Sequence, residues 1–433
     1  MLKALLVVVA SLFSLCAGGS APAESPVLPS EAETGPPAPP TEKPKDSLTF
    51  SSAYFEKMYT NKQLAGFCLE VIRLGAHVDN LLASSPWIII AVWRVSSMWI
   101  DFKYGTALHE AGHGLRLRAT YSDGAYALMH DIKATSPTKK NENFFKFFLL
   151  ELVSPGRAAC HYLSEERSET HRNADLYGEK SKDFESYHKK AIISGAGGIN
   201  NNVYLSELVS DRTFAQESMS SLECWSYFSN KVYGAAYAAK AKALGDDPYT
   251  VVYSYQALGI PATLSDIQRA GWISVAVSGT TYYMACASWN IFLGKEQPIR
   301  HFALWGLRVP DTCSYLTTKG VSFRTISEYN ICHHLDLTFG AEYIVYGHSA
   351  REFNVGVRQT LGETWHNMSY ACAFTFGLGF DAEASVRIPV SQRIALGADV
   401  GLYSEKSLLG ERHSPNLRKD YGANFSVSVS WMY

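Results

Sequence analysis

The sequence Leu335-Asp-Leu-Thr-Phe-Gly-Ala-Glu-Tyr-Ile-Val-Tyr346 indicates how the C-terminal third of this 433-residue chain folds. Every second residue from Leu335 to Tyr343 is apolar, and the residues between them are Asp, Thr, Gly and Glu. Successive side chains of a β-strand point to opposite faces, so a period of two indicates a strand with one apolar face. We therefore expect a strand here that belongs to an antiparallel sheet.

The same period recurs through the rest of the C-terminal third. Clear runs occupy residues 321–329, 353–361, 370–380, 382–390, 394–402 and 425–433, and a weaker run occupies 302–309. Seven clear runs and one weaker run predict eight antiparallel strands. We assign them to an antiparallel β domain over residues 298–433.

Aromatic side chains crowd the apolar face of these strands, among them Tyr343, Phe374, Phe376, Phe380 and Trp431. A transmembrane β-barrel shows this pattern, with apolar and aromatic residues facing lipid and polar residues facing the interior. We therefore expect an eight-stranded barrel with membrane lipid as a partner. The alternative is a water-soluble antiparallel sheet with one buried face, which produces the same alternation.

Residues 48–297 have a helical texture, so the chain is predicted to be α+β, with a helical domain followed by the β domain. Two apolar runs stand out within this part, at residues 86–100 and 270–294. The second run contains no charged residue and is long enough to cross a bilayer. The alternative location is therefore the inner membrane, with a soluble periplasmic β domain.

The N-terminus predicts export. Residues 1–23 combine Lys3, an apolar run and Ala21-Pro-Ala23, which is typical of a signal peptide with its cleavage site. Residues 24–47 are rich in Pro, Glu, Ser and Thr and are expected to form a disordered linker. Together with the barrel pattern, these features place the protein in the cell envelope, in the outer membrane.

Composition excludes one class of partner. The formal net charge is −2, and no basic patch with interleaved aromatic residues occurs, so nothing indicates nucleic-acid binding. The cysteines after residue 23 form no Cys-x-x-Cys pair, which argues against a structural zinc knuckle.

A short motif in the helical part indicates a metal site. His109-Glu110-Ala-Gly-His113 has the His-Glu-x-x-His pattern within a segment that can form one helix. Residues four apart lie on the same helical face, so His109 and His113 can offer two imidazole nitrogens to one zinc ion. Glu110 then lies beside a water that zinc acidifies, where its carboxylate can act as the catalytic base.

A second segment supplies the predicted third ligand. Glu207-Leu-Val-Ser-Asp211 resembles the Glu-x-x-x-Asp element of the gluzincin metallopeptidases. The resemblance implies that Glu207 is the third zinc ligand and that Asp211 orients a ligand imidazole. Two features depart from the family pattern: Ser206 replaces an Asn, and Glu207 lies 94 residues beyond His113, a wider separation than in thermolysin-like enzymes. Integral-membrane prenyl-protein peptidases also separate their motifs widely.

Other residues stay open as the third ligand, all within the charged stretch from 164 to 190: Glu166, Glu169, His171, Asp175 and His188. The adjoining segment Ser194-Gly-Ala-Gly-Gly-Ile-Asn-Asn-Asn202 is rich in residues that disfavour a helix interior. It predicts either a close backbone approach to the motif helix or substrate, or a tight helix contact or helix cap.

These observations predict a zinc-dependent envelope endopeptidase that hydrolyses protein or peptide substrates with a metal-activated water. One alternative is a non-enzymatic outer-membrane barrel, a pore or adhesin, with a helical plug. Another keeps the metal and acts as an amidase on cell-wall peptides.

Overall fold

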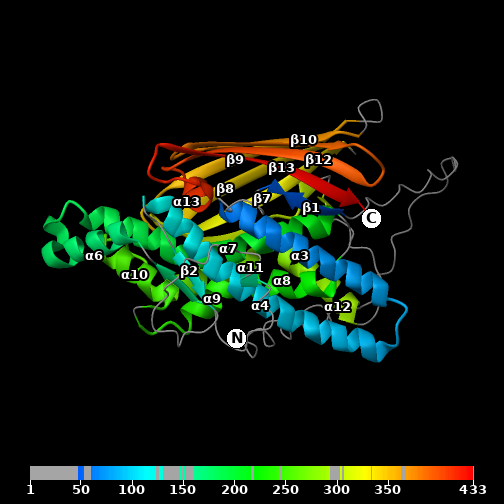
Figure 1. Ribbon diagram of the computed structural model, residues 1–433, viewed down its shortest axis with the longest axis horizontal. Helices are drawn as coiled ribbons and strands as arrows, with labels where there is room; N and C mark the ends of the chain where they lie inside the picture. Colours follow the sequence, from blue (N-terminus) through cyan, green and yellow to red (C-terminus); the bar gives the residue numbers. More distant parts are fainter. Residues whose placement is uncertain are drawn as a thin grey trace.

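The structure is a computed structural model that describes residues 47–52, 60–122, 126–129, 147–148, 151, 159–162, 164–215, 219–243, 245–292, 303–304, 307–332, 334–361 and 367–432. The predicted signal peptide and the predicted linker up to residue 46 lie outside the described residues. The molecule is α+β and has two layers, a broad antiparallel sheet and a layer of helices beneath it (Figure 1).

The large sheet contains eleven described strands in the order β1-β13-β12-β11-β10-β9-β8-β7-β5-β4, with β6 also paired to β7. All pairs are antiparallel. The strands are β1 (Ser47–Ser51), β4 (Ala303–Leu304), β5 (Leu307–Arg308), β6 (Asp311–Thr317), β7 (Gly320–Cys332), β8 (Leu335–Gly347), β9 (Arg351–Thr360), β10 (Ser369–Phe376), β11 (Phe380–Pro389), β12 (Ile394–Ser404) and β13 (Tyr421–Met432).

The predicted strands of residues 321–402 and 425–432 are confirmed as β7 to β13, but the predicted closure into an eight-stranded barrel is wrong. Within the described residues the strand order has two ends, at β1 and β4. Two strands of this large sheet were missed: β6, and β1, which pairs with β13 through Leu48 and Trp431. A period of two identifies a strand and its faces, but it does not determine which strands pair at the ends of a sheet.

The inner face of the sheet, which looks toward the helices, carries acidic residues that are paired with a cation or hydrogen-bonded. The guanidinium of Arg412, on the short helix α13 (Leu408–His413), donates two hydrogen bonds of 2.7 and 2.6 Å to Glu342. The carboxylate of Glu352 accepts hydrogen bonds from the first two backbone N–H groups of α13. Buried charges persist only when paired or hydrogen-bonded in this way.

The helical layer is built around one long central helix, α7 (Phe184–Ala215), which packs against α3, α4, α8 and α10 and against β6. The other helices are α3 (Asn61–Leu82), α4 (Trp87–Thr120), α6 (Glu165–Tyr177), α8 (Ser221–Lys231), α9 (Tyr233–Ala238), α10 (Asp247–Ala257), α11 (Leu264–Val277) and α12 (Gly279–Phe292). A separate two-stranded sheet, β2 (Tyr126–Met129) with β3 (Ala159–Tyr162), lies against α4.

Helices and sheet share their buried core. The amide of Asn200 on α7 both donates to the carbonyl oxygen of Leu316 and accepts from its N–H, at 2.8 and 2.9 Å. The Asn200 side chain thus satisfies both backbone hydrogen-bonding groups of Leu316 in β6. This pair of hydrogen bonds fixes α7 against the sheet. Cys313 and Tyr315 of β6 belong to the same buried cluster as residues of α3, α4 and α8.

The apolar run of residues 270–294 is divided between α11 and α12, which meet at Ser278. Gly279 lies there against Val309, so closely that a Cβ on the glycine would lie 2.0 Å from a methyl carbon of Val309. Among the described helices, none combines the length and the apolar character needed to cross a membrane.

Candidate metal centre

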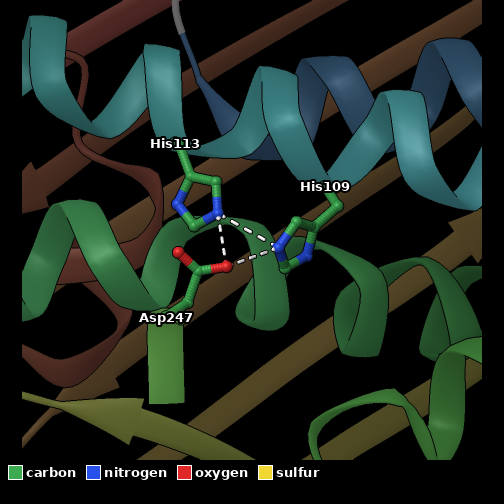
Figure 2. Close-up of side chains that lie close together, drawn as sticks. All are labelled: His109, His113 and Asp247. Atoms are coloured by element: carbon green, nitrogen blue, oxygen red, sulfur yellow. Dashed lines mark hydrogen bonds and ion pairs between the residues drawn. The ribbon is translucent and has the colours of Figure 1, made fainter. Parts of the chain in front are cut away.

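His109 and His113 lie one turn apart near the end of α4 and face the same side of it, as the motif predicts (Figure 2). Their Nε2 atoms are 3.1 Å apart, and each residue keeps only 2% of its surface exposed. The helix continues for about two turns beyond His113, so regular backbone hydrogen bonds hold both histidines in place.

The histidines face α7, which comes unusually close to α4. A Cβ on Gly112 would lie 2.7 Å from the carbonyl oxygen of Gly197, and a Cβ on Gly198 would lie 2.6 Å from Nε2 of His113. Only glycines allow the two backbones and the imidazoles to approach to this distance. The glycine-rich segment therefore forms the close approach to the motif helix, in the interior of α7 rather than at a cap.

The third member of the site is Asp247, at the first position of α10 (Figure 2). Its Oδ2 atom lies 2.8 Å from Nε2 of His109 and 3.1 Å from Nε2 of His113. These three atoms form the group that could hold a metal ion among the described residues.

Hydrogen bonds on the far side of each imidazole determine which nitrogen carries hydrogen. Nδ1 of His113 lies 2.7 Å from the carbonyl oxygen of Ser194, which can only accept. Nδ1 of His109 lies 3.1 Å from Oδ1 of Asn202, whose Nδ2 donates to Gly105 and Asn230 and so fixes the amide orientation. Both imidazoles therefore carry hydrogen on Nδ1, and both Nε2 atoms point toward Asp247.

Two imidazole nitrogens and one carboxylate oxygen this close together require a positive charge between them, either a shared proton or a metal ion. A shared proton satisfies two of the three atoms, whereas a metal ion is bound by all three. Tetrahedral zinc with bonds of about 2.0–2.1 Å would separate its donors by about 3.3 Å, and the observed separations are 2.8 to 3.1 Å. The residues present therefore fit a zinc ion with an open fourth position.

Electrostatics at the site favours positive charge. Burial lowers the pKa of His113, but the Asp247 carboxylate outweighs it and raises that pKa to about 9. Burial likewise works against ionisation of Asp247, but His113 and His109 lower the pKa of its carboxyl below the usual range. A metal ion would compete with a proton for this position, as at other sites with imidazole ligands.

Glu110 lies next to the group and lines the same cavity. Burial raises the pKa of its carboxyl, while His109, His113 and a hydrogen bond from the backbone of Cys160 on β3 lower it. The carboxylate is therefore close to the three-atom group without being part of it, which is the placement that the motif predicts for a general base.

A cavity of about 950 Å³ extends from this site, and Glu110, His113 and Asp247 line one side of it. Arg167 contributes a positive charge, with its guanidinium carbon 4.6 Å from the centre of the Tyr162 ring. Most of the remaining large lining side chains are aromatic: Trp99, Phe102, Tyr187, Trp225, Tyr233 and Tyr237. Trp99 and Phe102 are about half exposed, at 49% and 53%, so the cavity reaches the surface along α4.

The structure does not bring Glu207 to the histidines. Ser194, Gly198 and Asn202, four residues apart, form the face of α7 that contacts the site, and Glu207 lies about 180° around the helix from Gly198. Its carboxylate instead accepts hydrogen bonds from Tyr315, at 2.7 Å, and Arg324, at 2.6 Å. Glu207, the predicted third ligand, is therefore not part of the three-atom group, in which the carboxylate is that of Asp247.

Asp211 also lies elsewhere. Its carboxylate accepts a hydrogen bond of 2.9 Å from Arg308 and is half exposed, so it does not orient either imidazole. Asn202 and Ser194 take that role. Within the described residues the three-atom group includes none of the other candidate ligands, namely Glu166, Glu169, His171, Asp175 and His188.

Sequence reasoning missed Asp247, although one local signal was present. Asp246-Asp247-Pro248 marks the start of a helix, with Pro248 in its first turn. Such a start is common and does not reveal which distant side chains the carboxylate will meet.

Comparison of the chain with protein-family models, with curated proteins and with solved structures found no match.

Proposed function

We propose that this protein is a zinc-dependent hydrolase that cleaves peptide bonds, with His109, His113 and Asp247 as metal ligands and Glu110 as general base. The convergence of two Nε2 lone pairs and one carboxylate oxygen, all within 3.1 Å of one another, carries the proposal. Two histidines and one carboxylate with an open fourth position are the donor set of catalytic rather than structural zinc sites.

In this proposal the zinc ion activates the water and the substrate carbonyl, and the protein's own residues transfer the proton and orient the ligands. Zinc, when bound, would polarise the scissile carbonyl and make a water nucleophilic at neutral pH. With zinc bound, Glu110 would act as the general base, taking a proton from the water and delivering it to the leaving amine nitrogen. Ser194 and Asn202 hold the two imidazoles in the tautomer that leaves Nε2 free.

The cavity favours a peptide with bulky apolar side chains as substrate. Its aromatic lining offers stacking and apolar contact along a path from the surface to Glu110. The leader predicted from the sequence favours a substrate in the cell envelope. An amidase acting on cell-wall peptides would use the same residues, and the substrate profile separates the two activities.

The test is a Glu110→Gln variant of the full chain. We expect purified wild-type protein to bind one zinc ion per chain and to hydrolyse a mixed fluorogenic peptide library. The variant should retain zinc, measured by elemental analysis, and lose at least about 100-fold in kcat/KM. Full activity in this variant contradicts the proposal, and absence of zinc binding in the wild type favours a non-enzymatic role.

A further inference from the structure

The sheet has its polarity reversed relative to a sheet in water. An antiparallel sheet in a soluble protein turns its apolar face inward and its polar face outward. Here the inward positions of β8 to β12 include Glu342, Glu352, Asp381, Glu383 and Asp399. The outward positions of β8 to β13 carry one charged residue, Arg351, at the start of β9.

This outer face is both apolar and uncovered by the described residues. Phe425 keeps 67% of its surface exposed, and Val427, Leu396 and Trp431 each keep 48%. Large apolar side chains continue across six neighbouring strands at similar exposure. Contiguous apolar surfaces of this extent are rare on soluble monomers and mark an interaction surface.

The distribution of residue types on the face indicates what covers it. The register places Phe353, Phe376, Phe380 and Tyr421 in one row near one end of the strands. Aliphatic residues predominate in the rows further along the strands, as in the neighbours Leu396 and Val429, although Phe374 and Phe425 also lie there. An aliphatic band with an aromatic border is the surface that β-strands present to a bilayer, where aromatic rings lie at the interface.

A protein partner would need hydrogen-bonding side chains, and this face has very few of them. Protein interfaces carry on the order of one hydrogen bond per 100–200 Å², and the outward positions between the strand ends offer almost no hydrogen-bonding side chain. Acyl chains need none. We infer that the outer face of the sheet docks on the acyl chains of a lipid membrane, with the row of Phe376 and Phe380 at the interface and the catalytic cavity in the helical layer on the opposite side of the sheet.

Flotation with vesicles of dioleoyl phosphatidylcholine tests this surface. Full-length protein should float with the vesicles, and Leu396→Arg and Val427→Arg should each lower the bound fraction about tenfold or more, because both place a charge in the aliphatic band. Leu176→Arg is the matched control, since Leu176 on α6 is 68% exposed but lies outside the sheet. Every variant keeps the same N-terminal segment, so a difference in bound fraction between variants comes from the substituted position.

A second readout locates the contact. Vesicles of brominated phosphatidylcholine should quench the fluorescence of the wild type more than that of Trp431→Phe, because Trp431 lies on the outer face. Circular dichroism and thermal melts check that the variants are folded. Wild-type protein that stays with the dense fraction, or Leu396→Arg and Val427→Arg variants that still float, would overturn the inference. A vesicle-free dimer that Leu396→Arg converts to monomer would assign the face to a second copy instead.

Discussion

Gly198 lies directly against His113: a Cβ built on Gly198 would lie 2.6 Å from Nε2 of His113 and 2.7 Å from the His109 ring. The absence of a side chain at this position therefore allows the metal ligands to converge. The glycine-rich segment of α7 is thus part of the site, although none of its side chains contacts the three donor atoms.

Gly198→Ala should therefore abolish high-affinity zinc binding. The new methyl group would displace one or both imidazoles from the position where their lone pairs meet Asp247. Gly195→Ala is the matched control, because its Cβ would lie 3.2 Å from one methyl group of Val251, which can move aside. Zinc titration of both variants should show the loss in Gly198→Ala alone, and equal affinities would refute this role of Gly198.

The hydrogen bond between Asn202 and His109 predicts a smaller effect. Asn202→Ala removes the acceptor that holds hydrogen on Nδ1 of His109, and such losses typically weaken metal binding about 10- to 100-fold. Asn201→Ala is a control on the same helix, because Asn201 is equally buried but its amide donates to the carbonyl of Leu108. Similar zinc affinities in the two variants would contradict the role assigned to Asn202.

Asp247 and Glu207 can be separated by two substitutions that keep side-chain size. Asp247→Asn should lose zinc, because the amide is a poor ligand. Glu207→Gln should keep zinc but lower the free energy of unfolding by up to about 3 kcal/mol, because Arg324, whose side chain is 13% exposed, would lose its counter-charge. Metal analysis and chemical denaturation measure the two effects, and the reverse result would restore Glu207 as the ligand.

The predictable part of the site is the local part. His109, Glu110 and His113 lie within one turn and a half of helix, so the helical period alone determines their relative placement. Asp247 lies 134 residues beyond His113 and meets it only through the packing of α10 on α7. Glu207 has a family-like spacing, yet the rotation of α7 turns it toward Arg324, and spacing within one segment cannot reveal that rotation.

The sheet shows the same division. Alternation predicted β7 to β13 and the apolar character of one face, because strand and face follow from a local period. The ends of the sheet depend on β1, which pairs with β13 although about 380 residues separate them along the chain. The alternation alone was compatible with an apolar face turned outward or buried in a soluble core, and the packing of the helices against the other face shows that it is the outer one.

The inner face of the sheet makes stability depend on pH through Glu352. Its carboxyl is 1% exposed, and burial and the neighbouring Glu342 and Asp381 raise its pKa to about 8, against the opposing effect of Arg412. A carboxyl whose pKa is raised in the folded state favours folding fully below its unfolded pKa of about 4.3. That stability is lost as the pH rises through about 8.

Glu352→Gln should therefore unfold at a higher denaturant concentration than the wild type at pH 8 and at nearly the same concentration at pH 4. Each unit of pKa shift corresponds to about 1.4 kcal/mol, so the difference at pH 8 is large enough to measure by urea denaturation. Glu169→Gln, at an exposed position, should unfold at the wild-type denaturant concentration at both pH values. If the wild type and Glu352→Gln lose stability in parallel between pH 4 and 8, another group causes the loss, and Glu352 is ionised in the folded protein at no cost.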